Sequence, residues 1–112
     1  MSDRRVTVAD VEDARERIDD VVHRTPLDTS RTFADLSGAA SVGLKLENVQ
    51  RTGSFKIRGA YNTMGQLSPA ARDAGVISSS AGNHAQGVAL AGQLLEIETT
   101  IVVPVVTPAA KI

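Results

Sequence analysis

The sequence predicts an α/β fold with parallel strands, and three observations support this class. Residues 75–80 read as a short strand that ends in small hydroxyl residues, residues 99–103 read as the next strand, and a small-residue helical segment at 84–95 lies between them. A strand, helix, strand unit of this length needs a crossover connection, which favours parallel pairing in a right-handed arrangement. Apolar residues also alternate with other types at 42–47, the period of a strand, and recur at helical spacing at 57–64.

Two helices are predicted ahead of the first strand. Thr7 and Asp10 form a helix start, and this helix ends before Pro26 because proline disfavours a helical conformation in the preceding residue. Its apolar face consists of Val11, Ala14, Ile18, Val21 and Val22. Ser30 can cap a second, shorter helix, which Gly38 ends.

The middle of the chain leads from a strand into a helix. The strand at 42–47 carries Lys45 and Glu47 on its polar face. Ser54 is a good N-cap for the helix that follows, so Lys56 lies in the first turn of that helix, beside free backbone N–H groups.

Three further residues near these elements have structural interpretations. Gly59 and Gly87 lie within helical patterns, and close helix packing explains them more readily than ligand contact does. Arg58 is interpreted as a surface or domain-bridging charge, with no catalytic role.

Composition limits the functions open to the chain. The net charge of -1 over 112 residues gives no electrostatic reason to expect nucleic acid or an anionic membrane as a partner. Cysteine is absent, and the two histidines, His23 and His84, are too few for a metal cluster. The longest apolar run, residues 101–106, is too short to span a bilayer, and the N-terminus lacks an apolar signal core. We therefore expect a cytoplasmic protein with a small-molecule ligand and no metal.

Lys56 has the clearest chemical potential. It is one of three lysines, with Lys45 and Lys111, in a chain that otherwise carries its positive charge on arginine. Burial can make a lysine amine nucleophilic near neutral pH, so that it forms an imine with a carbonyl, which a guanidinium cannot do. A second motif, at residues 80–87, follows a predicted strand and begins a helix, which is where parallel sheets bind ligands and anions.

Both motifs resemble those of one enzyme family. The run S-F-K-I-R-G-A at residues 54–60 is similar to the S-F-K-x-R-G-A signature of fold type II pyridoxal-phosphate enzymes, in particular the threonine and serine dehydratases. The run S-A-G-N-H-A-Q-G at residues 80–87 resembles their S-x-G-N-H-x-Q-G loop. The resemblance extends from about residue 24 to the end of the chain. It implies the tryptophan-synthase-β-like fold, a parallel three-layer α/β sheet, of which this chain would form an incomplete N-terminal part.

The resemblance assigns roles to individual residues. Lys56 would be catalytic and would hold pyridoxal 5'-phosphate as an internal imine, with Phe55 packed against the pyridine ring. Asn83 would donate a hydrogen bond to the phenolic oxygen of the cofactor. The substrate carboxylate would be bound by one loop, which consists of Ser80, Ala81, Gly82, Asn83 and His84. This loop is physically suitable, because glycine lets a backbone approach an anion and a helix N-terminus adds a favourable partial charge.

The implied reaction is the deamination of a small hydroxy amino acid. Lys56 would remove the α-proton, the β-hydroxyl would leave, and hydrolysis would give a 2-oxo acid and ammonia. Threonine would yield 2-oxobutanoate and serine would yield pyruvate, in amino-acid metabolism such as isoleucine biosynthesis. In serine-racemase-like relatives the residue after the loop serine carries a hydroxyl that can reprotonate the opposite face, whereas Ala81 cannot. Ala81 therefore favours elimination over racemisation.

The resemblance also implies a domain division. Residues 1–50 would belong to a large domain, and residues 51–112 would form the first part of a small α/β domain. A helix start at 107–111 comes at the very end of the sequence, so we expect the leading part of a larger protein. The resemblance implies that the intact relatives are homo-oligomeric. The family's glycine-rich phosphate loop lies further downstream in intact members, so the chain alone is expected to be inactive. Glu96 stands where relatives usually have glycine.

Two other interpretations stay open. One is a nucleotide- or anion-binding α/β module that uses residues 82–84 at a helix start without covalent chemistry. Against it, neither G-x-G-x-x-G nor G-x-x-x-x-G-K-[ST] follows any predicted strand. The other is a non-functional remnant that folds poorly because apolar sheet edges are left uncovered.

Overall fold

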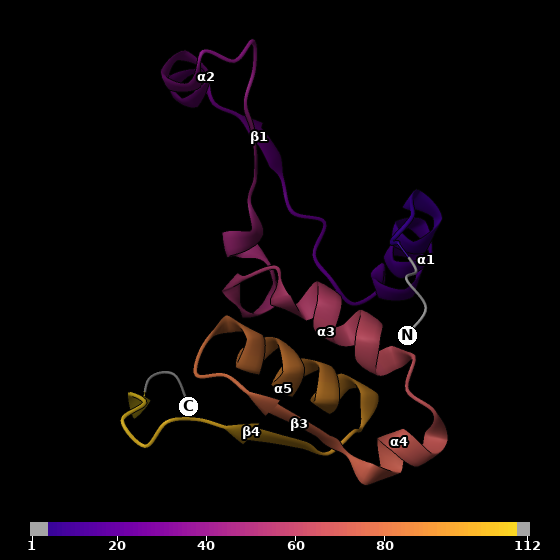
Figure 1. The fold of residues 1–112 in the computed structure, drawn as a ribbon. Helices are drawn as coiled ribbons and strands as arrows, with labels where there is room; N and C mark the ends of the chain where they lie inside the picture. The colour runs from indigo at the N-terminus through magenta and orange to yellow at the C-terminus, as the bar shows by residue number, and fades with distance from the viewer. Residues whose placement is uncertain (1–4, 110–112) are drawn as a thin grey trace.

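The predicted strand, helix, strand unit is the centre of the fold. A computed structural model describes residues 5–109, and in it β3 (Val76–Ser79), α5 (Asn83–Leu95) and β4 (Thr99–Val102) follow one another as expected (Figure 1). β3 and β4 pair in parallel, in a register that begins at Val76↔Thr99. The α/β class and the parallel pairing are therefore confirmed.

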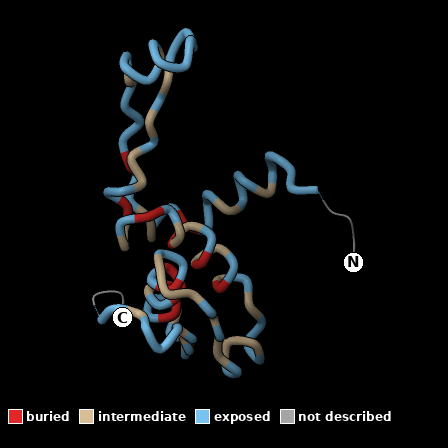
Figure 2. Tube along the Cα trace, turned by 60° about the vertical axis from the view of Figure 1, so that its left-hand side comes forward, coloured by how far each residue is buried: buried red, intermediate tan, exposed pale blue. Residues whose placement is uncertain are grey.

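The core lies between α5 and α3 (Lys56–Gly65), which Figure 1 shows running side by side. Its buried apolar residues are Ile57, Ala60, Met64, Val88, Ala91 and Ile97. Ile57 is completely buried, and Figure 2 shows that buried segments gather where these two helices meet. The helical pattern predicted at 57–64 thus faces the core, as an amphipathic helix should.

Only one face of the β3–β4 sheet is covered by the described residues. Ser78 and Ile101 on that face are partly buried, whereas Ile77 and Val102 on the opposite face are 76% and 52% exposed. The part of the chain that the structure describes therefore contains a helix layer and a sheet layer, and not the complete three-layer arrangement of the predicted fold.

The two helical glycines have different environments. A Cβ built on Gly87 would lie 2.9 Å from the backbone of Lys56, so the prediction of close helix packing is confirmed for Gly87. A Cβ built on Gly59 would meet no atom of another described residue within 4 Å. The same prediction is wrong for Gly59, because none of the described residues comes within contact distance of a side chain placed there.

The first helix is shorter than predicted. α1 (Val8–Ile18) begins with the expected capping box between Thr7 and Asp10, but it ends at Ile18 instead of continuing to Pro26. The backbone N–H and C=O of His23 are both hydrogen-bonded to the side-chain amide of Gln50, at 2.8 Å each. This contact with a distant residue draws the chain out of the helix before Pro26.

An arm follows, formed by β1 (Leu27–Thr29), α2 (Arg31–Ser37) and β2 (Gly43–Lys45). β1 was not predicted, and it pairs with β2 in an antiparallel sense. Ser30 caps α2 and Gly38 ends it in the left-handed conformation, as predicted. Figure 1 shows the arm projecting away from α3 and α5, and Figure 2 shows that most of it is exposed. The predicted domain division at residue 50 stays a prediction.

Three short elements were not predicted from the sequence. Two are single 3-10 turns, η1 (Glu47–Val49) and η2 (Arg51–Gly53), and the third is α4 (Pro69–Ala74). η1 begins at Glu47 and cuts the strand predicted at 42–47 to three residues. None of the helices within residues 5–109 is long and apolar enough to cross a membrane. The helix start predicted at 107–111 lies partly outside the described residues.

Candidate active site at the start of helix α3

Lys56 lies in the first turn of α3, as predicted. Phe55 occupies the N-cap position, so the predicted cap, Ser54, is one residue too early. Ser54 is nevertheless buried and its Oγ accepts a hydrogen bond from the backbone N–H of Lys56 at 3.3 Å. The hydroxyl therefore satisfies one of the free N–H groups at the helix start, which is the role that a cap performs.

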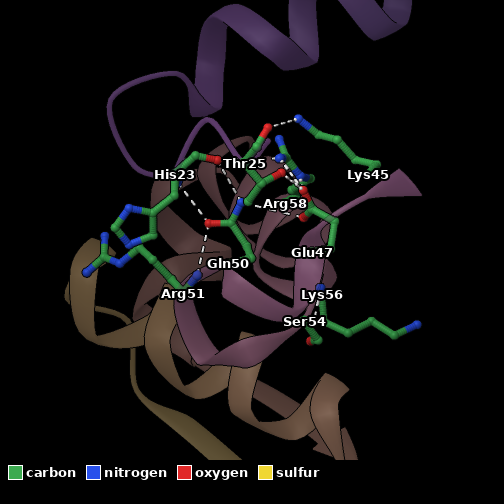
Figure 3. Close-up of polar contacts among 9 residues, drawn as sticks. All are labelled: His23, Thr25, Lys45, Glu47, Gln50, Arg51, Ser54, Lys56 and Arg58. Atoms are coloured by element: carbon green, nitrogen blue, oxygen red, sulfur yellow. Dashed lines mark hydrogen bonds and ion pairs between the residues drawn. The ribbon is translucent and has the colours of Figure 1, made fainter. Parts of the chain in front are cut away.

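The amine of Lys56 has no polar partner within residues 5–109. Its Nζ atom lies 4.6 Å from the centre of the Phe55 ring, and it makes no hydrogen bond or ion pair with the described residues. Phe55 itself is 56% exposed. Figure 3 shows the Lys56 side chain extending away from the polar residues on the other side of the helix. An amine in this position is available to a ligand.

Lys56 and Phe55 line a cavity of about 420 Å³ between α3, β3 and the start of α5. Most of its wall is apolar, and Gly59 and His84 also line it. Gly59 lies one helical turn after Lys56, and the lack of a side chain there leaves open space beside the lysine. The cavity therefore combines one amine with walls that can accept a flat, largely apolar ring.

The second motif forms the turn between β3 and α5. The Ser80 hydroxyl accepts a hydrogen bond from the N–H of Gly82 at 3.2 Å, and Gly82 occupies the N-cap position of α5 without a side-chain cap. The first N–H groups of α5 therefore receive no side-chain acceptor from the cap residue, and such groups favour an anion. Asn83 and His84 are exposed.

The structure brings only part of the second motif to the cavity of Lys56. His84 lines that cavity, whereas Ser80, Ala81, Gly82 and Asn83 do not. The substrate-binding role of this loop and the cofactor contact of Asn83 stay predictions.

A polar cluster on the opposite side of α3 was not predicted. We call it the Glu47 cluster, and its members are Thr25, Glu47, Gln50 and Arg58. Arg58 donates two hydrogen bonds to the Glu47 carboxylate, from Nε at 2.8 Å and from Nη2 at 2.7 Å. Thr25 Oγ1 donates a third at 2.6 Å. Figure 3 shows these side chains converging from separate segments.

This cluster corrects two interpretations of the sequence. Glu47 does not lie on the polar face of a strand, because it begins η1 and its side chain is only 15% exposed. Arg58 is not a free surface charge, because its ion pair with Glu47 connects α3 to η1. Whether this contact bridges two domains depends on the predicted domain division, which stays a prediction. Hydrogen bonds from Arg58 are the main cause that lowers the pKa of Glu47 from 4.5 to about 2, and the same contact raises the pKa of Arg58. Arg58 and Thr25 lie 11 and 22 positions from Glu47 along the chain, so their contacts with it leave no local pattern in the sequence.

The residues present fit the aldehyde and ring of pyridoxal phosphate. An aldehyde needs a lysine amine that is free of competing ion pairs, and Lys56 Nζ meets that condition among the described residues. A planar ring needs an accessible aromatic or apolar wall, which the exposed Phe55 and the space beside Gly59 provide.

The chain is similar to several characterised proteins. It is 50% identical to an L-threonine ammonia-lyase of Thermotoga maritima over 96% of this chain and 26% of that protein. It is 52% identical to an L-threo-3-hydroxyaspartate ammonia-lyase of a Pseudomonas species, over 92% of this chain and 32% of that protein. Its structure matches that of serine racemase from Dictyostelium discoideum with a TM-score of 0.86 and 38% identity, over 95% of this chain and 34% of that one.

The chain thus spans between a quarter and about a third of the length of these relatives. The family model described as pyridoxal-phosphate dependent enzyme matches residues 18–112. That match covers most of the sequence and includes both motifs that form the candidate site. The chain belongs to the pyridoxal-phosphate dependent enzyme family.

Proposed function

We propose that the protein carrying this chain is a pyridoxal-phosphate-dependent ammonia-lyase that converts L-threonine, or L-serine, to a 2-oxo acid and ammonia. The observation that carries the proposal is the amine of Lys56, which has no polar partner among the described residues and lines the cavity beside α3. Two relatives named as ammonia-lyases support the reaction class.

Pyridoxal phosphate, when bound, supplies an aldehyde for a lysine amine and an electron-accepting ring. Lys56 would hold the aldehyde carbon through Nζ, and Phe55 would pack against the ring. Asn83, at the start of α5, would donate a hydrogen bond to the phenolic oxygen. The open space beside Gly59 supports this placement, because any side chain there would enter the same cavity.

Lys56 would also move the proton on which the reaction depends. Once its amine is released by the incoming amino group, it can accept the proton from the α-carbon of the substrate. Ser80 and the first N–H groups of α5 would orient the substrate carboxylate, since free N–H groups at a helix start attract anions. Threonine then loses its β-hydroxyl as water and regains water on hydrolysis, so that one threonine gives one 2-oxobutanoate and one ammonia.

The substrate class is inferred from what the named relatives share. L-threonine and L-threo-3-hydroxyaspartate both carry a hydroxyl on the β-carbon, which is the leaving group in the proposed elimination. Serine has the same group and is the smaller alternative. The homo-oligomeric state and the place in isoleucine biosynthesis depend on the family resemblance and stay predictions.

Amino-acid racemisation is the second candidate, because the matched structure from Dictyostelium discoideum is a serine racemase. Racemisation needs a proton donor on the face of the α-carbon opposite Lys56. Ala81, next to Ser80, offers a methyl group, which cannot donate a proton. The intact protein, given L-serine, should release pyruvate faster than it forms D-serine, and the reverse order would favour racemisation.

The proposal is tested by chemical trapping. The chain is incubated with pyridoxal phosphate, reduced with borohydride and digested, and the modified peptide is identified by mass spectrometry. We expect the stable adduct on Lys56 in preference to Lys45 and Lys111, and we expect Lys56→Arg to abolish it because a guanidinium does not form the bond. Tight phosphate binding without an adduct would instead support the anion-binding module.

A further inference from the structure

Five side chains from residues 45–58 fasten the segment between α1 and β1, residues 21–25, to the start of α3. Arg51 donates a hydrogen bond to the carbonyl of Val21 at 2.9 Å, and Gln50 holds both backbone groups of His23. The contacts to Thr25 come from Lys45 Nζ, which donates to its carbonyl at 2.6 Å, and from the Glu47 carboxylate, which accepts from its hydroxyl. Arg58 Nη2 adds a longer bond to the carbonyl of His23 at 3.5 Å. All five side chains belong to the segment that surrounds Lys56.

We propose that Glu47, Arg58 and Gln50 are positioning residues for Lys56, and that the Glu47 cluster fixes the direction in which the Lys56 amine points. The inference deepens the proposed function and rests on it, because the direction of the amine matters for the bond to the aldehyde and for the proton at the α-carbon.

The geometry of α3 carries the first step of the argument. Residues two apart on an α-helix project about 200° from each other around the axis. Arg58 therefore points towards Glu47 when Lys56 points towards the cavity. Figure 3 shows the two side chains leaving the helix in different directions. Two parallel hydrogen bonds from one guanidinium to one carboxylate define an orientation, which a single contact does not. The pair thereby sets the rotation of the first turn of α3.

The turn before α3 carries the second step. Thr52 and Gly53 both adopt the left-handed conformation, with φ of 64° and 74°. That conformation is unfavourable for a β-branched residue, and the buried Thr52 Oγ1 has no hydrogen-bond partner among the described residues. Gln50 holds this turn, because its side chain accepts the N–H of Arg51 at 2.9 Å and its carbonyl accepts the N–H of Gly53 at 2.8 Å. A turn that is unfavourable by itself and leads directly to Lys56 depends on this support.

Three variants separate the parts of the cluster. Glu47→Gln removes the charge that receives Arg58, Arg58→Lys keeps the charge but loses the two parallel bonds, and Thr25→Val removes one hydrogen bond only. Arg72→Gln is the matched control. Arg72 also donates hydrogen bonds to backbone carbonyls, those of Gly65 and Leu67, but at the other end of α3.

Two measurements on the 112-residue chain test the proposal. The first, without cofactor, is the nuclear Overhauser effect between the Lys56 ε-methylene and the Phe55 ring, which reports the contact seen at 4.6 Å. The second is the rate of the borohydride-trapped adduct at Lys56 relative to Lys45 and Lys111. We expect Glu47→Gln and Arg58→Lys to weaken the first and to lower the second by about 10- to 100-fold, as expected for a misplaced reacting group. Arg72→Gln should leave both as in the unmodified chain.

The outcomes are distinguishable. If Glu47→Gln and Arg58→Lys keep the circular dichroism spectrum, the Overhauser effect and the Lys56 adduct rate of the unmodified chain, the positioning role is refuted. If the unmodified chain forms no Lys56 adduct, the proposed role of Lys56 as the cofactor-binding lysine fails, while the cofactor-free measurement still decides the positioning role. If Glu47→Gln unfolds the chain, Thr25→Val provides the test, with a smaller change expected in the same direction.

Discussion

Gly87 lies against the backbone of Lys56. A Cβ built at position 87 would lie 2.9 Å from the carbonyl carbon of Lys56 and 3.1 Å from the backbone nitrogen of Ile57. α5 therefore approaches the first turn of α3 backbone to backbone, which only glycine allows at this distance. The start of α3 is held by α5 on one side and by the Glu47 cluster on another.

Replacing Gly87 by alanine should destabilise the fold. The added methyl group would overlap backbone atoms that cannot move independently, so we expect the free energy of unfolding to fall by about 1–3 kcal/mol. Urea unfolding followed by circular dichroism measures the change. Because the displaced atoms belong to Lys56, the rate of adduct formation with pyridoxal phosphate should fall as well. Unchanged stability would mean that the two helices do not approach as closely as the structure indicates.

Replacing Gly59 by alanine should have the opposite effect on stability. Gly59 lies in the interior of α3 and a methyl group there meets no atom of another residue within the part of the chain that the structure describes, so alanine should stabilise the helix by about 0.5–1 kcal/mol. The same methyl group would enter the cavity beside Lys56, and we expect a lower adduct yield at that lysine. Higher stability combined with an unchanged adduct yield would show that the cofactor ring does not use this space.

Glu96→Gly should stabilise the chain. Glu96 ends α5 in the left-handed conformation, with φ of 55°, which costs a residue with a side chain about 1–2 kcal/mol. Glycine avoids most of this cost but loses more backbone entropy on folding than glutamate does. The net expected effect is an increase of about 1 kcal/mol in the free energy of unfolding. Gly38→Ala is the reciprocal control, because Gly38 ends α2 with φ of 70° and alanine should be unfavourable there. A loss of stability on Glu96→Gly would contradict this account.

The Glu47 cluster should make stability depend on pH in the acid range. The pKa of Glu47 is lowered in the folded chain, so its contribution is complete above its usual value of 4.5 and is lost as the pH falls from there towards about 2. Water screens part of the contact with Arg58. We therefore expect the free energy of unfolding to fall by about 1–2 kcal/mol between pH 6 and pH 3. Urea unfolding across this range provides the measurement.

Glu47→Gln should remove that part of the pH dependence. Glu12→Gln, at an exposed position on α1, is the matched control and should keep it. If both variants show the same pH dependence as the unmodified chain, the acid-sensitive group is not Glu47.

Local patterns were sufficient to predict much of this chain. The capping box at Thr7, the caps at Ser30 and Gly38, and the strand, helix, strand unit each depend on residues within a few positions of one another. The placement of Lys56 in the first turn of α3 follows from the same kind of signal. Parallel pairing of β3 and β4 also follows, because the crossover length permits no tight turn.

The tertiary structure decided what depends on distant partners. α1 ends early because Gln50, 27 positions from His23, takes over the backbone hydrogen bonds of that residue. Glu47 is an ion-pair partner because η1 turns it towards Arg58. Helical periodicity treats Gly59 and Gly87 alike, but packing brings a backbone against Gly87 and leaves space beside Gly59. The sequence alone thus determined the segments that form α2, α3, β3, α5 and β4 and the place of the reactive lysine at the start of α3, because those properties depend on neighbouring residues. Only the folded chain determined what surrounds that lysine, because contacts between remote segments leave no periodic trace.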